Sequence, residues 1–213
     1  MEVWKMKESE DKGENITNAA LVLEKTYKNI DQLMNKMDEI ADEMGYILIT
    51  KDDFLRFCTP RKPAFFYIRD FVKLYQENKD ESSKINPELE NSFVNEPILG
   101  VQIHLKGENT SETYPVIRIA KYRYDDRSEL KNKDPADISS KNSEYHKYFR
   151  RPFQKKRFNI EKKENCWVST PKKDDSEIYG QIKEMKFKEI PLVDIKSERD
   201  IREKIFRGFD TLP

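Results

Sequence analysis

The feature that most constrains this chain is an apolar stripe that runs from Ile16 to Met44. Its side chains recur in alternating steps of four and three, which places them on one side of an α-helix. They are Ile16, Ala20, Leu23, Tyr27, Ile30, Met34, Met37, Ala41 and Met44. Asn15 or Asn18 can cap the start, because a short amide side chain accepts from free backbone N–H groups. Gly45 follows the last apolar residue, where a helix exit often needs positive φ. The sequence therefore predicts one long amphipathic helix over 16–44.

This stripe is compatible with two kinds of packing. If Ala20 and Tyr27 occupy heptad position a, the flanking g positions are uncharged: Ala19, Thr26, Leu33 and Ile40. A two-stranded coiled coil normally keeps charges at g to select its partner. A wide apolar face instead suits a helix that lies on a sheet. We expect the helix to pack within its own domain, and a homodimer through 16–44 is the alternative.

The next part of the chain alternates between β patterns and polar loops. Strands are predicted where β-branched and aromatic residues alternate with polar ones, in 46–50, 53–58, 97–106, 114–124, 158–160, 166–170 and 185–195. The turn-forming run 107–112 joins two of these segments into an antiparallel hairpin, and 162–165 joins another two. Pro191 lacks an N–H, which suggests an edge or a bulge within the last strand.

Two segments are predicted to be helical near and beyond these strands. In 64–76, Ala64, Ile68 and Val72 lie on one helical face, although a strand buried on both sides would also fit. Near the C-terminus, Ser197 to Asp200 resembles a capping box with Asp in place of Glu. Ile201, Ile205 and Phe209 then form a short amphipathic helix.

This order of elements predicts an α+β fold: a long N-terminal amphipathic helix packed on a mostly antiparallel sheet, with a short C-terminal helix. Repeating βαβ units are absent from the pattern, which disfavours a parallel sheet. Residues 1–14 form a polar lead-in, and 15–213 form a single domain of ordinary size. Within this domain, 77–96 and 125–157 are expected to be exposed, charged excursions.

The charge balance limits how this protein can attract a partner. Lys and Arg number 40, as do Asp and Glu, so no global field favours nucleic acid or a membrane surface. No apolar run approaches the roughly 20 residues that span a bilayer, and 1–14 has no signal-peptide pattern. Cys58 and Cys166 are expected to be free, buried thiols, with a single disulfide as the alternative. Together these features predict a cytoplasmic protein without a membrane partner.

The strongest local candidate for binding is the basic and aromatic segment 147–163. Its candidate binding residues are Lys147, Arg150, Arg151, Lys155, Lys156, Arg157, Lys162 and Lys163, with the rings of Tyr148, Phe149 and Phe153. Cations neutralise phosphates and rings stack on bases, so this mixture suits single-stranded nucleic acid. The same rings could instead hold a solvated basic loop against the core. The patch could also pair with an acidic surface, either 77–96 or another protein.

No catalytic, metal or cofactor site is predicted. His104 lies mid-strand, where it points to solvent or to a hydrogen-bonded partner, and His146 lacks a matching nucleophile. The cysteines and histidines have no close ligand spacing, and no glycine-rich phosphate loop occurs. Glu184-Met185-Lys186, with Asp174 and Asp175 upstream, only loosely resembles the acid and lysine set of a metal-dependent nuclease.

The favoured interpretation is a non-catalytic cytoplasmic interaction module that binds another protein. Its basis is the segregation of charge along the chain, together with aromatic-rich strands. A nucleic-acid-binding protein that uses 147–163 is the alternative. A metal-dependent nuclease or other hydrolase is the third hypothesis.

Overall fold

The computed structural model describes residues 2–49, 55–57, 70–77, 97–105, 115–124, 149, 151–172 and 182–213. Side chains are described within these ranges except at 2–12, 55–57 and 151. The chain divides into two compact units, Met1–Glu39 and Ile40–Pro213.

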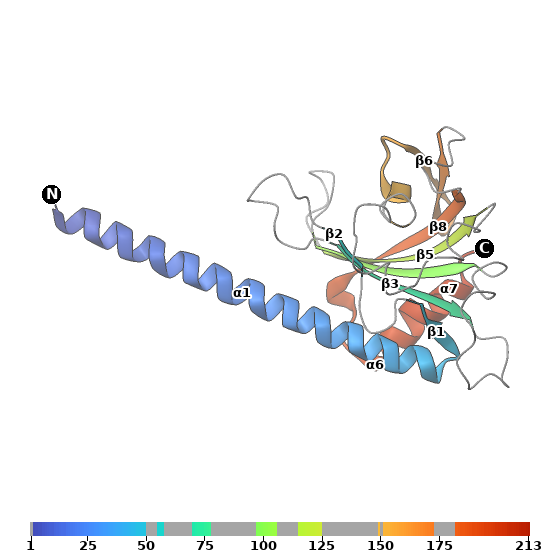
Figure 1. The fold of residues 1–213 in the computed structure, drawn as a ribbon, viewed down its shortest axis with the longest axis horizontal. Coiled ribbons are helices and arrows are strands. Elements are labelled where there is room, and N and C mark those ends of the chain that lie inside the picture. The colour runs from blue at the N-terminus through green and yellow to red at the C-terminus, as the bar shows by residue number, and fades with distance from the viewer. Residues whose placement is uncertain are drawn as a thin grey trace. The chain divides into compact units, whose positions relative to one another are not determined.

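The first element is α1, Glu2–Glu43, a single continuous helix (Figure 1). The predicted helix is confirmed, but it begins at Glu2 and not near Ile16, so the polar residues 2–14 continue the same helix. Its end agrees with the sequence analysis. The N–H of Gly45 donates to the Asp42 carbonyl at 3.1 Å, and Gly45 adopts a φ of 79°, which glycine tolerates at a helix exit.

The second unit is built on an antiparallel sheet of eight strands, in the order β1-β3-β4-β5-β8-β7-β6, with β2 also paired to β3. Their bounds are β1 Tyr46–Leu48, β2 Leu55–Phe57, β3 Asp70–Glu77, β4 Ile98–His104, β5 Val116–Tyr124, β6 Phe158–Lys163, β7 Cys166–Pro171 and β8 Ile182–Pro191. The predicted pairs β4–β5 and β6–β7 are confirmed. In the β6–β7 hairpin, Glu164 occupies the turn with a φ of 37°.

One face of the sheet carries the main hydrophobic core. The strand register places Leu74, Gly100 and Ala120 side by side on this face, because directly paired residues share a face. The core residues are Ile49, Val72, Leu74, Ile98, Ala120, Tyr122, Phe149, Phe153, Phe158, Ile182, Met185 and Phe187. The short helix η3, Arg151–Phe153, contributes Phe153, whose ring lies 5.1 Å from that of Phe187. Ser169 donates to the Pro152 carbonyl at 2.5 Å, which ties η3 to β7.

The other face is covered by the C-terminal segment, which runs through η4 Leu192–Asp194, α6 Glu198–Asp200, η5 Ile201–Phe206 and α7 Arg207–Asp210 (Figure 1). The ring of Phe206 lies 5.4 Å from that of Tyr75 on β3. Lys121 on β5 donates to the carbonyl of Leu212 at 3.2 Å. The predicted amphipathic C-terminal helix is therefore confirmed, although η5 is a π-helix. Its residues Ile201, Ile205 and Phe209 are buried.

The predicted capping box at the start of this segment is also confirmed. The Ser197 hydroxyl accepts from the backbone N–H of Asp200 at 3.2 Å. The Asp200 carboxylate accepts from the Ser197 hydroxyl at 2.8 Å and from the Lys196 backbone N–H at 3.1 Å. Asp therefore reaches one residue further back than the Glu of a standard box, which returns to the N-cap itself.

The helix predicted over 64–76 is wrong where the structure describes it, because 70–77 is strand β3. Phe71, Val72, Leu74 and Tyr75 are all buried, and so are Asp70, Lys73 and Gln76. A strand covered on both faces loses the alternation that identifies a strand in sequence. A strand buried on both sides, which this sequence also fits, is the observed structure.

The remaining expectations concern the fold class, the charged excursions, the cysteines and the membrane, and some of them lie partly outside the described residues. The α+β class is confirmed by the long helix, the antiparallel sheet and the short C-terminal helix. Most of the excursions 77–96 and 125–157 lies outside the described residues. Cys166 is a free, buried thiol as expected, whereas Cys58 lies outside the described part of the chain. None of the helices that the structure describes is long and apolar enough to cross a bilayer.

Candidate functional site

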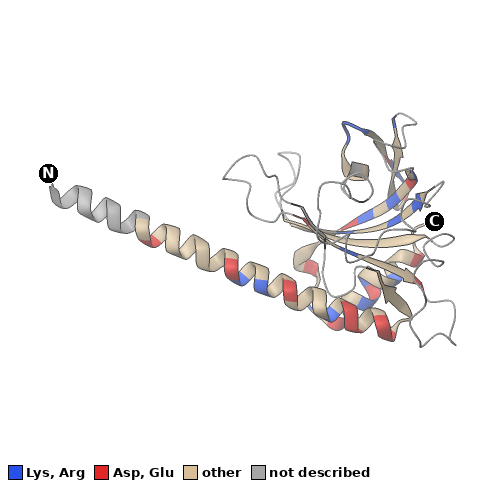
Figure 2. Cartoon of the chain, viewed as in Figure 1, with Lys and Arg blue, Asp and Glu red and all other residues tan. Residues whose placement is uncertain are grey.

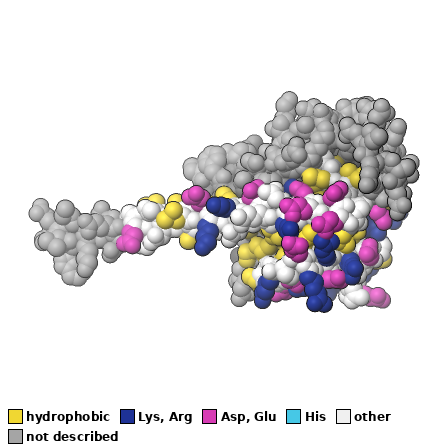
Figure 3. Space-filling view, turned by 90° about the horizontal axis from the view of Figure 1, so that it is seen from below, with side chains coloured by type: hydrophobic (Ala, Val, Ile, Leu, Met, Phe, Trp, Pro, Cys, Tyr) yellow, Lys and Arg dark blue, Asp and Glu magenta, His cyan; other side chains and the backbone are white. Residues whose placement is uncertain are grey.

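The most exposed apolar surface of the described chain lies on α1. Ile16, Leu21, Val22 and Leu23 are 72%, 56%, 66% and 40% exposed, and the only other large apolar side chain of this kind among the described residues is Val193. We call these four residues the α1 surface. Figure 3 shows hydrophobic side chains at the surface of this helix. Ala19 and Ala20, which are also exposed, make the run 19–23 apolar without interruption.

The helix that carries the α1 surface has little to stabilise it alone. Every described residue from Gly13 to Lys25 is exposed. In proteins, most helical stability comes from packing of an apolar face against another surface. Thr17 and Val22 are β-branched residues with a lower helix propensity than leucine or alanine. This stretch of α1 therefore has the properties of a helix that is completed by contact with another surface.

The basic segment predicted as a binding site is only partly described. Lys155, Lys156, Lys162 and Lys163 are exposed, and we call them the basic hairpin residues. Figure 2 marks the Lys and Arg positions along the ribbon in blue. The Lys162 ammonium lies 5.9 Å from the centre of the Trp167 ring, a cation–π distance. Arg157 is half-buried. Lys147, Tyr148, Arg150 and the side chain of Arg151 lie outside the described residues.

Two rings of this predicted site belong to the core. Phe149 is 1% exposed and Phe153 is 7% exposed, and both lie in the core cluster. The Phe149 ring lies 5.5 Å from that of Tyr122, whose hydroxyl donates to the Phe149 carbonyl at 3.1 Å. These rings therefore hold the segment to the sheet and do not offer a face for a base to stack on.

A second site candidate is a buried polar cluster where β3 begins and β4 ends. Asp70, Gln102 and His104 are each at most 2% exposed. One carboxylate oxygen of Asp70 accepts from Gln102 Nε2 at 3.0 Å and also contacts His104 Nδ1. Because an ionised carboxylate only accepts, this contact places a proton of His104 on Nδ1. Among the described residues, His104 Nε2 and Gln102 Oε1 have no hydrogen-bond partner.

The cluster continues across the sheet as a polar row. Arg118 lies opposite Gln102 on β5, and Glu189 lies opposite Arg118 on β8. Arg118 Nε donates to the Glu189 carboxylate at 2.7 Å, and its guanidinium lies 5.0 Å from the centre of the Phe153 ring. An Asp–His pair with a bare ring nitrogen is the arrangement of a general base. No nucleophile lies beside it among the residues that the structure describes.

His104 is recognisable from the sequence, whereas its partner Asp70 is not. Of the two positions expected for His104, facing solvent or a hydrogen-bonded partner, the second is observed. Gln102 and His104 alternate with Val101 and Ile103, a pattern that normally marks one solvated face. The strand register pairs Asp70 with His104, and only this pairing reveals that the polar side is buried.

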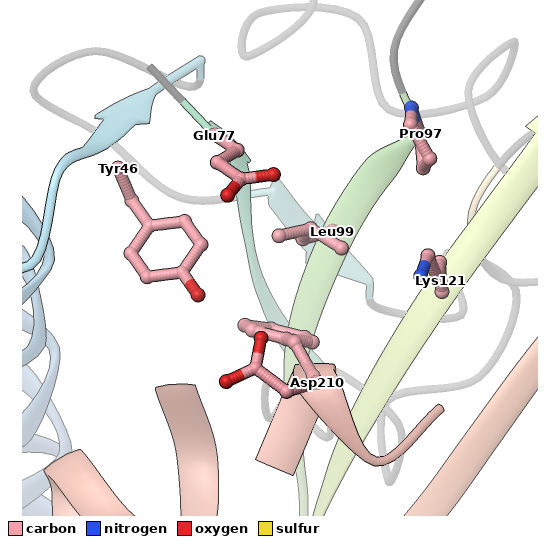
Figure 4. A pocket seen from close by; sticks show the side chains of 7 residues that line it. Tyr46, Glu77, Pro97, Leu99, Lys121 and Asp210 are labelled. Carbon is pink, nitrogen blue, oxygen red and sulfur yellow. The ribbon is translucent and has the colours of Figure 1, made fainter. Parts of the chain in front are cut away.

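A pocket of about 210 Å³ lies in the second unit at the opposite end of β3 and β4 (Figure 4). Its walls are Tyr46, Glu77, Pro97, Leu99, Lys121, Phe209 and Asp210. Tyr46 pairs with Glu77 across β1 and β3, and its ring lies 6.2 Å from that of Phe209. Sequence analysis did not identify this pocket, since its residues come from segments far apart in the chain.

The electrostatics of the pocket are dominated by its carboxylates. Partial burial raises the pKa of Tyr46, and the negative charges of Asp210 and Glu77 raise it further. Tyr46 therefore stays a neutral hydroxyl that can donate and accept. Two carboxylates against the single ammonium of Lys121 leave the lining with an excess negative charge, a setting that favours cations over anions.

Glu184, which the sequence placed in a loosely nuclease-like set of an acid and a lysine, forms ion pairs with basic residues of β8 and β5. The Glu184 carboxylate lies 3.4 Å from the Lys186 ammonium and 3.5 Å from the Arg123 guanidinium. Asp174 and Asp175 lie outside the described residues. Within the described part of the chain, no three His, Cys, Asp or Glu side chains gather closely enough to hold a metal ion.

Comparison with known proteins returned no similarity: no family model, no curated protein and no solved structure matches this chain.

Proposed function

We propose that this protein is a non-catalytic interaction module that binds another protein through the α1 surface. The single observation that supports this proposal is the exposure of Ile16, Leu21, Val22 and Leu23 within eight residues of one helix. Ile16 and Leu23 lie on the same side of the helix, whereas Leu21 and Val22 lie on its other sides. Exposed apolar patches are typical of protein–protein interfaces. Ile16, Ala20 and Leu23 also have the spacing by which an amphipathic helix anchors in a partner.

The proposal can be tested with the full chain in its native cell. A photo-crosslinking amino acid is placed at Leu23, and a matched variant carries it at Val193, an exposed apolar residue of the second unit. We expect a cross-linked product of defined mass at position 23 and not at position 193. A stoichiometric partner should also co-purify with the unmodified protein and be lost from Leu23→Ser.

Leu23→Ser is a clean variant because its side chain is already 40% exposed, so the fold should survive. Circular dichroism checks this directly. A product at neither position, or equal products at both, contradicts the proposal. Retention of the same partner by Leu23→Ser places the interface elsewhere and also contradicts it.

A second candidate function is nucleic-acid binding through the basic hairpin residues. The observation that favours it is that Lys155, Lys156, Lys162 and Lys163 are exposed together, with Lys162 beside the half-buried Trp167. Phosphate neutralisation would supply most of the affinity, because Phe149 and Phe153 are in the core.

The test for this second function is salt-dependent binding of single-stranded DNA and RNA. Changing the four basic hairpin lysines to Glu should abolish binding, whereas Lys25→Glu with Lys28→Glu in α1 should leave binding unchanged. Absence of binding by the unmodified protein at low salt excludes this function. The slope of affinity against salt counts the phosphates that are neutralised.

A further inference from the structure

We infer that the pocket beside Tyr46 binds a small organic cation, namely an ammonium or guanidinium group on a short aliphatic stem. The pocket lies wholly within the second unit and shares no residue with the α1 surface, so its ligand is independent of the proposed function. Three properties of the pocket point to such a ligand: its unpaired acidic groups, the position of its one lysine, and its apolar walls.

The polar groups on one side of the pocket are acidic and lack partners. In Figure 4 the hydroxyl end of Tyr46 points toward Asp210, and the Glu77 carboxylate lies on the same side of the pocket. Burial raises the pKa of Tyr46, and the charges of Asp210 and then Glu77 raise it further, because both carboxylates lie close to the ring. None of these three side chains forms a hydrogen bond or an ion pair with another residue that the structure describes. Two carboxylates without a counter-ion favour a cation between them.

The single lysine of the lining is engaged elsewhere. The Lys121 ammonium donates to the carbonyl of Leu212 at 3.2 Å, in the C-terminal segment. Figure 4 shows Lys121 across the pocket from Tyr46 and Glu77. The positive charge of this lysine is therefore held away from the acidic side, which a cation from outside can neutralise.

The remaining walls are apolar. Leu99 and Phe209 are buried, and Pro97 is half-buried. The Phe209 ring lies 6.2 Å from that of Tyr46, with the two planes 55° apart, so the rings form a corner. A cation is attracted to the face of an aromatic ring, and an aliphatic stem gains free energy by leaving water for apolar walls. These walls therefore suit a cation that carries its own apolar stem.

An organic cation fits this lining better than a metal ion does. Calcium takes about six to eight oxygen ligands, whereas the side chains of this lining offer two carboxylates and one hydroxyl. The volume of about 210 Å³ is also below the roughly 300–1,000 Å³ of pockets that hold drug-sized ligands. The ligand is therefore the size of one basic side chain, supplied either by a free amine or by a Lys or Arg of a peptide.

The probes are n-pentylamine and its uncharged counterpart 1-pentanol, titrated against the full chain and followed in ¹H–¹⁵N correlation spectra. We expect pentylamine to bind with a Kd on the order of 1 mM, which suits a ligand of so few atoms. Pentanol should bind about tenfold more weakly, because it lacks the charge. The shifted amides should include those of Tyr46, Leu99 and Phe209.

A third probe, N-acetyl-lysine methylamide, distinguishes the two sources of the cation. Binding as tight as that of pentylamine identifies a basic side chain of a peptide as the ligand. Binding of pentylamine alone identifies a free amine, because the peptide backbone would then not fit at the mouth of the pocket. Either result agrees with the inferred chemistry.

Variants of the full chain locate the effect. Glu77→Gln with Asp210→Asn should weaken pentylamine binding about tenfold, because both charges are lost while the side chains keep their size. The matched control is Asp194→Asn with Glu161→Gln, which removes the same charge from two exposed positions outside the pocket and should leave binding unchanged. Circular dichroism confirms that each variant is folded.

The inference is wrong if pentylamine does not bind, if 1-pentanol binds as tightly, or if the double pocket variant binds as tightly as the unmodified protein. Equal weakening by the pocket variant and the control variant also contradicts it, since the effect would then come from net charge alone. None of these variants changes α1, so a failure here leaves the cross-linking test at position 23 unaffected.

Discussion

The buried cluster of Asp70, Gln102 and His104 shows how a few residues determine local structure. Gln102 and His104 both contact one carboxylate oxygen of Asp70, and all three side chains are buried away from water. A buried polar group that loses its partner costs free energy that is not recovered elsewhere. The cluster therefore fixes the pairing of β3 with β4 at the end where His104 lies.

Replacing Asp70 by Asn tests this dependence. The amide cannot accept from both neighbours as strongly as a carboxylate, so we expect a loss of about 1–3 kcal/mol in the free energy of unfolding. Urea denaturation measures the loss, and Asp194→Asn, at an exposed position, should change stability by less than about 0.5 kcal/mol. In ¹⁵N spectra, His104 should carry its proton on Nδ1. Equal stability of the two variants would contradict this role of Asp70.

Two glycines that closely approach a neighbour should respond differently to alanine. A Cβ at Gly100 would lie 2.7 Å from Cε2 of Tyr122, a buried ring held by its hydrogen bond to Phe149. We expect Gly100→Ala to cost about 1–3 kcal/mol, because the ring cannot move aside. A Cβ at Gly208 would meet only the flexible Cδ1 of Ile119 at 2.5 Å.

For Gly208→Ala, the gain in helix propensity of about 1 kcal/mol opposes the crowding, so the net change should be near zero. Thermal unfolding of both variants makes the comparison. A Gly208→Ala variant that is less stable than Gly100→Ala would show that Ile119 is the more rigid neighbour.

At the scale of the element, the C-terminal segment depends on the capping interactions of Asp200. Hydrogen bonds from Lys204, then Ser197, then the Lys196 backbone hold the pKa of Asp200 well below its ordinary value of 3.8. Folding therefore favours the ionised carboxylate. This contribution to stability is present above the ordinary pKa, and it is lost as the pH falls below 3.8 toward the lower pKa of the folded state.

The difference in stability between the unmodified protein and Asp200→Asn should accordingly shrink as the pH is lowered from 7 toward 2. Denaturation midpoints across this range measure it, and added salt should also reduce it because the pair is exposed. A difference independent of pH would show that folding does not lower the pKa of Asp200, and it would contradict this role. Ser197→Ala should be destabilising at every pH, since the hydroxyl does not titrate in this range.

At the scale of the whole molecule, the second unit is a sheet covered on both faces. The C-terminal segment supplies one cover, in which the fully buried ring of Phe206 lies 5.3 Å from Tyr46 and 5.4 Å from Tyr75. Removing this ring by Phe206→Ala should cost about 3–5 kcal/mol, because a cavity remains between β1, β3 and the C-terminal segment. Val193→Ala, at a residue 62% exposed, is the control and should be nearly neutral.

This prediction is measured by urea unfolding followed in the far ultraviolet. A loss below about 1 kcal/mol for Phe206→Ala would mean that the sheet does not depend on this cover.

A substitution in the α1 surface should have no such effect on stability. Leu23→Ser should not change the unfolding of the second unit, since its side chain is already exposed to solvent.

The sequence by itself determined those elements whose pattern is local. The stripe of 16–44, the exit at Gly45, the two hairpins and the capping box at Ser197 each depend on spacing within a few turns or residues, so periodicity and turn chemistry identify them. The start of α1 at Glu2 was not predictable in this way, because residues 2–14 carry no clear apolar stripe.

Only the tertiary structure decided which side chains are buried. The sequence pattern of strand β3 resembles that of a helix, because cover on both faces removes its alternation. Phe149 and Phe153 looked available for binding, yet they pack in the core, while Asp70 joined His104 only through the strand register. The pocket beside Tyr46 draws on five elements or their flanks. Burial is a property of residues far apart in sequence, and a single stretch of chain does not carry that information.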